Sequence, residues 1–145
     1  MSTVNDFLTK EDEQEVVNAI ALAEKRTSGE IRVHIESTTS IDAFERATEV
    51  FHQLEMDKTQ LKNGVLIYIA IQDHKFAICG DKGINEVVEP DFWDCTRDIM
   101  RNHFKNGNFK QGLIDGILRA GEKLSTYFPC DDCDMNELSN EISKG

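Results

Sequence analysis

The sequence lacks an apolar run long enough to cross a membrane. Its longest run spans residues 64–71, well short of the roughly 20 residues that a membrane-spanning helix needs. The N-terminal residues contain no basic stretch followed by an apolar one, which is the pattern of a secretory signal. Cysteine is also scarce, because four cysteines in 145 residues are too few and too scattered for a disulfide framework. We therefore expect a cytoplasmic protein that does not bind membranes.

Basic side chains are in the minority. The chain has 16 lysines and arginines against 27 aspartates and glutamates, which gives a formal net charge of -11. This balance argues against nucleic acids as partners, because a surface that binds phosphates needs a basic excess. It leaves divalent cations, or a protein partner that an acidic surface engages, as candidate ligands of a monomer.

Length and composition fit one globular domain. Hydrophobic residues make up 39% of the chain and charged residues 30%, which is typical of a folded protein. A chain of 145 residues is also long enough to bury a conventional core. Residues 130–145 carry five acids against one lysine. We expect a single domain over residues 1–129 and an acidic, loop-like tail over residues 130–145.

The spacing of apolar residues predicts four long helices and three strands. Apolar positions three or four residues apart predict helices over about 10–26, 44–54, 90–104 and 113–124. Alternation over residues 31–35 predicts a strand with one buried face. The continuous apolar run that begins at residue 65 predicts a central strand covered on both faces, and a short strand follows at 76–79.

This order of elements predicts a three-layer α/β/α sandwich that is Rossmann-like, with a mixed central sheet of about four strands and helices on both faces. The first two strands are expected to be parallel and the third antiparallel. With that topology, three loops meet at one end of the sheet: residues 27–30, 57–63 and 81–89. The turn at residues 72–75 lies at the other end.

Five segments together resemble one known family. They are TSGEIRV (27–33), NGVLIYIA (63–70), KFAICGDKGI (75–84), FKNGNF (104–109) and QGLIDGI (111–117). The sequence resembles the TPM domain family over roughly residues 7–128. That family includes a thylakoid-lumen phosphatase and a photosystem II repair protein. Most members add a signal peptide or a membrane anchor. This sequence shows neither pattern, so we expect a stand-alone domain.

The resemblance implies an α/β/α sandwich with divalent metal sites, often for calcium, that hold two crossing loops beside the sheet. It also implies acid phosphatase activity for some members. The usual family loop reads Gly-Tyr-Gly-Leu-Glu, and here Asn85 stands at the place of its glutamate. Asp81 is an additional carboxylate in this loop, and Glu86 lies one place later.

Carboxylate and amide oxygens at the predicted loop end form a candidate site for Ca²⁺ or Mg²⁺, because both ions prefer oxygen ligands. The candidate ligands are Asp81, Glu86, Glu30, Asn85, Asp57 and Glu89. The alternative is that they are solvated loop acids, with Asp81 as a turn former and Glu86 as a residue at a helix start.

Other motifs are weaker. Residues 132–136 fit the first ligand positions of a calcium loop, but Glu137 stands where that loop requires glycine. Cys130 and Cys133 form a CxxC without a second pair of ligands, so free thiols are expected. His34 lies on the polar face of its strand, near no serine or cysteine in the sequence that suggests a nucleophile.

These observations favour a metal-binding module whose crossing loops become ordered when calcium or magnesium binds, and which can act as a metal-responsive regulator. One alternative is a metal-dependent acid phosphatase in which Asp81 holds the metal or activates water. Another is an acidic adaptor that engages a protein partner.

Overall fold

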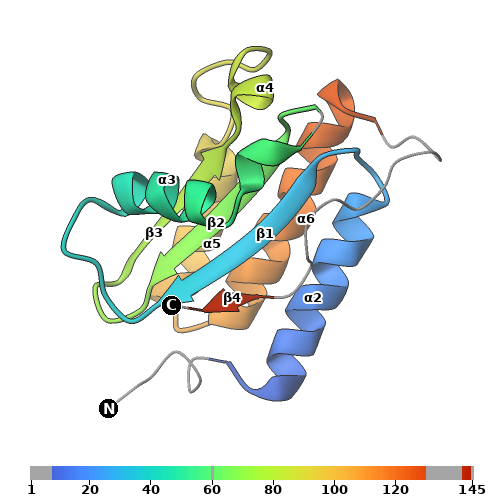
Figure 1. The fold of residues 1–145 in the computed structure, drawn as a ribbon. Helices are drawn as coiled ribbons and strands as arrows, with labels where there is room; N and C mark the ends of the chain where they lie inside the picture. The colour runs from blue at the N-terminus through green and yellow to red at the C-terminus, as the bar shows by residue number, and fades with distance from the viewer. Residues whose placement is uncertain (1–7, 60, 130–141, 145) are drawn as a thin grey trace.

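The computed structural model describes residues 8–59, 61–129 and 142–144. Figure 1 shows the elements in their spatial arrangement. In chain order they are α2 (Lys10–Glu24), β1 (Glu30–Glu36), α3 (Ala43–Gln53), the 3₁₀ turn η1 (Met56–Lys58), β2 (Gly64–Ala70), β3 (Lys75–Gly80), α4 (Lys82–Asn85), α5 (Asp94–Lys105), α6 (Phe109–Tyr127) and β4 (Ser143–Lys144).

The strands form one mixed sheet in the order β3-β2-β1-β4. As predicted, β1 and β2 are parallel and β3 pairs with β2 antiparallel. The fourth strand is the short β4, which pairs in parallel with the outer edge of β1. This strand lies within the stretch that the sequence indicates as an acidic tail, so that part of the tail returns to the sheet.

Helices cover both faces of the sheet, which confirms the predicted α/β/α sandwich (Figure 1). On one face, α2, α5 and α6 enclose the larger core, to which β1 contributes Ile31, Val33 and Ile35. On the other face, α3 packs over β2 and β3 and encloses a smaller core that contains Leu66 and Tyr68. Every residue of β2 is buried, as its continuous apolar sequence predicts.

Side-chain caps and close helix packing fix the positions of the helices. The Thr9 hydroxyl accepts a hydrogen bond from the Asp12 amide at 3.0 Å and starts α2. Asp42 starts α3 by accepting from the amides of Phe44 and Glu45. Between α5 and α6, a Cβ atom at Gly116 would lie only 2.5 Å from the Met100 sulfur. The absence of a side chain there lets the two helices approach closely.

Two sequence predictions are wrong. The helix expected from Pro90 begins at Asp94, because residues 89–94 form tight turns with the Phe92 amide bonded to the Glu89 carbonyl at 3.0 Å. The first strand is not half-exposed, since six of its seven residues are buried and only Arg32 is partly exposed. Its polar face is covered by side chains that lie far away in the sequence.

Among the described residues, no helix is both long enough and apolar enough to cross a membrane. Cys79 is buried in β3 and Cys95 is exposed on α5, and both are free thiols. Cys130, Cys133 and the calcium-loop-like segment at 132–136 lie outside the described residues.

Candidate functional site

Three loops meet at one end of the sheet, as the topology predicts. The Glu30 amide donates to the Asn63 carbonyl at 3.3 Å, and the Asp81 amide donates to the Gly64 carbonyl at 2.9 Å. The backbone of Gly83 lies so close to residues 61–62 that an added Cβ would be 2.4 Å from the carbonyl oxygens of both. The loops before β2 and after β3 therefore cross backbone to backbone, and only glycine fits at this crossing.

A pocket of about 510 Å³ lies beside this crossing, between α3 and the two loops. Residues of α3 line one side, among them Thr48 and His52. The opposite side is lined by Asp57 and Lys62 from one loop and by residues 79–82 and 85 from the other. The pocket therefore lies between α3 and the loops that the sequence indicates as a metal site.

Asp81 is the most constrained of the predicted site residues. Its side chain is buried, and its Oδ1 accepts a hydrogen bond from the Lys82 amide at 2.7 Å, which starts α4. Its Oδ2 is buried without a hydrogen-bond partner among the described residues. A buried carboxylate oxygen without a donor is costly, so this atom is suited to binding a ligand with positive charge.

Two more predicted residues share the pocket with Asp81. Asp57 lines it from the loop before β2, and Asn85 lines it from α4. The Asn85 side-chain nitrogen donates to the Gly80 carbonyl at 3.1 Å, which leaves the amide oxygen as an acceptor. The structure thus brings together two carboxylates and one amide oxygen of the predicted set.

The other three predicted residues do not line the pocket. Glu30 is buried and opposes Gly64 in the sheet register, so Gly64 separates it from Asp81 across the sheet. Glu86 and Glu89 follow the single turn of α4 and are exposed. Within the described part of the chain, no group of three or more His, Cys, Asp or Glu side chains is close enough to hold a metal ion.

Basic side chains also line the pocket, and of these the sequence indicates only Lys82, which lies in the loop after β3. Lys62 and Lys82 contribute ammonium groups, and His52 contributes an imidazole whose Nδ1 lies 3.7 Å from Asp57 Oδ2. The Lys62 ammonium donates to the Asp57 carbonyl, and Lys62 itself has a positive φ of 52°. Sequence spacing does not indicate this arrangement, because it depends on the contacts of Asp57 with Lys62 and His52.

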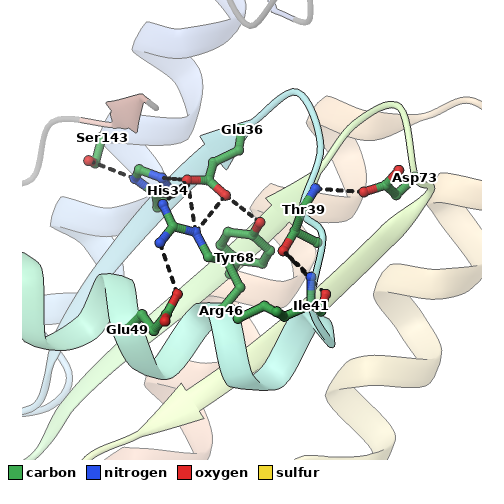
Figure 2. A network of polar contacts seen from close by, with 9 residues as sticks. All are labelled: His34, Glu36, Thr39, Ile41, Arg46, Glu49, Tyr68, Asp73 and Ser143. Carbon is green, nitrogen blue, oxygen red and sulfur yellow. Dashed lines mark hydrogen bonds and ion pairs between the residues drawn. The ribbon is translucent and has the colours of Figure 1, made fainter.

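A second polar cluster, also missed by the sequence analysis, covers the polar face of β1 (Figure 2). At its centre, the buried Glu36 accepts from Arg46 Nε at 3.0 Å and from the Tyr68 hydroxyl at 2.5 Å. His34 Nε2 lies 3.2 Å from Glu36 Oε1, and His34 Nδ1 lies 2.8 Å from Ser143 Oγ of β4. His34 is thus buried beside a serine, which corrects the expectation from sequence.

Burial and hydrogen bonding oppose each other in this cluster. Burial would raise the pKa of Glu36, but the donors Arg46, Tyr68 and His34 together outweigh it and lower the pKa to about 2. Burial also lowers the pKa of His34, against the attraction of Glu36, and raises the pKa of Tyr68, where Glu36 adds to the effect. The cluster is therefore built around the Glu36 and Arg46 pair, which is charged at neutral pH, and it connects β1, α3, β2 and β4. None of its side chains lines a described pocket.

A further link joins the loops at the opposite end of the sheet. The Asp73 carboxylate accepts from the Thr39 amide at 2.7 Å (Figure 2). It also accepts from the Thr38 hydroxyl at 2.8 Å. The loop after β1 is thereby attached to the turn between β2 and β3. This end is well bonded internally, so the loop end with Asp81 is the better candidate for a site that binds a ligand.

The solved structures that resemble this fold support the architecture. The chain is 59% identical to the BA42 protein from the psychrophilic bacterium Bizionia argentinensis, with complete coverage of both chains and a TM-score of 0.93. The N-terminal domain of a protein from P. gingivalis is 19% identical, with 84% of this chain and 79% of that chain covered and a TM-score of 0.67. The N-terminal domain of a Corynebacterium glutamicum protein is 11% identical, with 95% and 80% covered and a TM-score of 0.57. At these low identities the last two relatives show the fold alone.

Among curated proteins, no sequence matches this chain. The family comparison is more informative, because the TPM domain matches residues 2–123. The match spans the three loops that meet at one end of the sheet and most of the larger core. It agrees with the resemblance that the sequence motifs carry. The chain belongs to the TPM domain family.

Proposed function

We propose that this TPM domain binds Ca²⁺ or Mg²⁺ in the pocket between α3 and the crossing loops. The observation that supports the proposal is the buried Oδ2 atom of Asp81, which has no hydrogen-bond partner among the described residues and belongs to a side chain that lines the pocket. A bound cation would satisfy this oxygen, and hard divalent cations select carboxylate oxygens as ligands.

The proposed ligand set is made of oxygens from both loops. Asp81 and Asp57 provide carboxylates, and Asn85 provides its amide oxygen. Water molecules would complete the shell, because calcium takes six to eight oxygens and magnesium retains several waters. Glu30 does not line the pocket, but it opposes Gly64, whose carbonyl accepts from the Asp81 amide, and Gly64 has no side chain to fill the space between them. In this proposal Glu30 could coordinate the metal only if its side chain moved toward the pocket.

Binding would make the crossing loops responsive to the metal. The ammonium groups of Lys62 and Lys82 share the pocket and must move away from an incoming cation, because like charges repel. The Lys62 ammonium is bonded to the Asp57 carbonyl. Displacement of Lys62 by a metal would therefore release one loop contact and form new ones, which couples loop structure to metal binding.

The test is a calcium titration of the whole chain, followed by thermal unfolding and by NMR of backbone amides. A ligand that binds only the folded state raises the melting temperature as its concentration exceeds Kd. We expect a saturable rise that a chelator reverses, with amide shifts concentrated in residues 57–64 and 80–86. Magnesium should compete. Unchanged melting and unchanged amide shifts at millimolar calcium and magnesium would refute the proposal.

A metal-dependent phosphatase is the second candidate, favoured by the positive groups in the same pocket. Lys62, Lys82 and His52 are placed where a phosphate bound to the metal would need partners. p-Nitrophenyl phosphate hydrolysis with magnesium should then depend on Asp81, and Lys82→Gln should raise KM more than it lowers kcat. Hydrolysis that persists at full rate in Asp81→Asn would exclude this activity for the pocket.

A further inference from the structure

A second pocket lies at the end of the sheet away from the crossing loops. Its volume is about 550 Å³, within the range of small-molecule sites. The end of β2 and the start of β3 form one wall, and the C-terminal part of α5 with the turn into α6 forms the other. The pocket shares no residue with the proposed metal site.

The walls of this pocket are apolar and largely aromatic. Phe76 and Phe104 meet edge to face with ring centroids 5.1 Å apart, and Phe109 continues the aromatic surface 5.8 Å from Phe104. Ile69 and Ile71 complete the wall on the β2 side. All three phenylalanines are partly exposed, so the apolar surface is open to a ligand and not sealed inside the core.

The rim of the pocket is basic, in a chain whose net charge is -11. His74, Lys75, Arg101 and Lys105 line it and are exposed. Neither Lys75 nor Lys105 has an ion-pair partner within 4.0 Å among the described residues.

Acids near the rim are already engaged with other groups. The Asp73 carboxylate accepts hydrogen bonds from the Thr38 hydroxyl and the Thr39 amide, and it also attracts Lys75 and His74 of the rim. Asp98 pairs with Arg101 at 3.2 Å on the exposed surface of α5, while the Arg101 guanidinium stays 6.0 Å from the Phe76 ring centroid. The three cations Lys75, Arg101 and Lys105 outnumber the acids Asp73 and Asp98, so the rim presents more positive than negative charge to a ligand.

We propose that this pocket binds a small amphipathic anion, with a medium-chain carboxylate as the simplest example. The apolar body would cover the rings of Phe76, Phe104 and Phe109, and the carboxylate would lie at the rim between Lys75, Arg101 and Lys105. Burial of an apolar body in the aromatic walls supplies affinity. The basic rim selects the sign of the headgroup.

Charge argues against a second copy of this chain as the occupant. Two copies that met symmetrically through this pocket would bring the same basic rims together, which is unfavourable. Free phosphate is a poorer match, because it would leave the aromatic wall exposed to water.

The test uses octanoate as the probe, with octan-1-ol and octyltrimethylammonium as neutral and cationic controls of equal chain length. The titration is followed by NMR of the full chain in the presence of a chelator, which keeps the metal site out of the measurement. We expect octanoate to shift amides of residues 69–76 and 101–109, and to bind at least about tenfold more tightly than octyltrimethylammonium.

Two variants with equal charge change test the role of the rim. Arg101→Gln with Lys105→Gln removes two rim charges, and Lys25→Gln with Arg26→Gln removes two exposed charges at the distant end of α2. The rim variant should weaken octanoate binding about five- to tenfold, and the α2 variant should leave it within about twofold. Thermal unfolding checks that both variants fold, which is expected because all four side chains are exposed.

Several results would overturn the proposal. The first three are that octanoate fails to bind, that the cationic probe binds equally well, and that the rim variant keeps the affinity of the parent chain. A fourth such result is a set of amide shifts that depend on protein concentration and not on octanoate. The last result would identify a second copy of the chain as the occupant. Because a chelator is present, failure of this test is independent of whether the loops bind calcium.

Discussion

One carboxylate oxygen of Asp81 accepts a hydrogen bond from the Lys82 amide at 2.7 Å, while its other oxygen is buried with no hydrogen-bond partner among the described residues. The first contact is structural, since it starts α4. The second oxygen lacks a donor among the described residues, and in our proposal it binds the metal. A single side chain would thus hold the loop in place and bind the ligand.

The crossing of the two loops should be sensitive to any side chain at position 83. In Gly83→Ala the added methyl group would meet the carbonyl oxygens of Leu61 and Lys62 at 2.4 Å. We expect a loss of about 1–3 kcal/mol in the free energy of unfolding, measured by urea denaturation. Gly80→Ala is the matched control, because its nearest neighbour would be 3.5 Å away. Equal costs for the two variants would contradict the backbone contact.

Glu36 should make the fold sensitive to acid. Its pKa falls from an ordinary 4.5 to about 2, because hydrogen bonds from Arg46, Tyr68 and His34 outweigh the effect of burial. A carboxyl group with a lowered pKa contributes stability above its unfolded pKa and loses it as the pH falls. The contribution should thus be lost between about pH 4.5 and pH 2. Urea denaturation across this range measures it.

Substitution of Glu36 gives a second measure of the same cluster. Glu36→Gln should cost about 2–3 kcal/mol at pH 7, because it leaves the partly buried Arg46 without its main partner. Glu49→Gln removes the other, exposed partner of Arg46 and should cost less than about 0.5 kcal/mol. A pH dependence of stability that remains unchanged in Glu36→Gln would place the acid sensitivity elsewhere.

Glu24 should have the opposite pH dependence. Burial raises its pKa from 4.5 to about 7, the hydrogen bond from the Ile31 amide opposes this, and the charge of Glu30 adds to it. A carboxyl group with a raised pKa contributes stability at low pH and loses it as the pH rises toward 7.

The variant Glu24→Gln tests this directly, because its amide oxygen can still accept from Ile31. We expect it to be more stable than the parent by about 2 kcal/mol at pH 8 and equal to it near pH 4.5. Thermal unfolding at both pH values measures the difference. Glu122→Gln, at an exposed position of α6, should change stability at neither pH.

The sequence predicts the framework well because its periodicities are strong. Apolar alternation and continuous apolar runs locate β1, β2 and β3 within one or two residues, and helix spacing locates α2, α3 and α6. The start of α5 is misplaced, because Pro90 is compatible both with the first turn of a helix and with the tight turns that residues 89–94 form. β4 has no sequence signal, since two residues carry no period.

Contacts between distant segments limit what the sequence reveals about the sites. The alternation in β1 indicates a solvent-facing side, but Arg46 of α3 and Ser143 of β4 cover that side. At the loop end, topology correctly brings residues 30, 57 and 81 to one edge of the sheet. It does not predict which side chains line the pocket. Asn85, the last residue of α4, lines it, whereas Glu86 and Glu89, which follow α4, do not.

Calorimetric titration of calcium into the parent chain and into Asp81→Asn tests the account most directly. Asparagine retains the oxygen that starts α4 but replaces the proposed ligand oxygen with an NH2 group and removes the negative charge. Glu89→Gln is the control with an equal charge change outside the pocket. We predict that Asp81→Asn weakens calcium binding by about tenfold or more, which is about 1.4 kcal/mol or more, while Glu89→Gln stays within about twofold. Equal calcium affinity in Asp81→Asn and the parent chain would contradict the account.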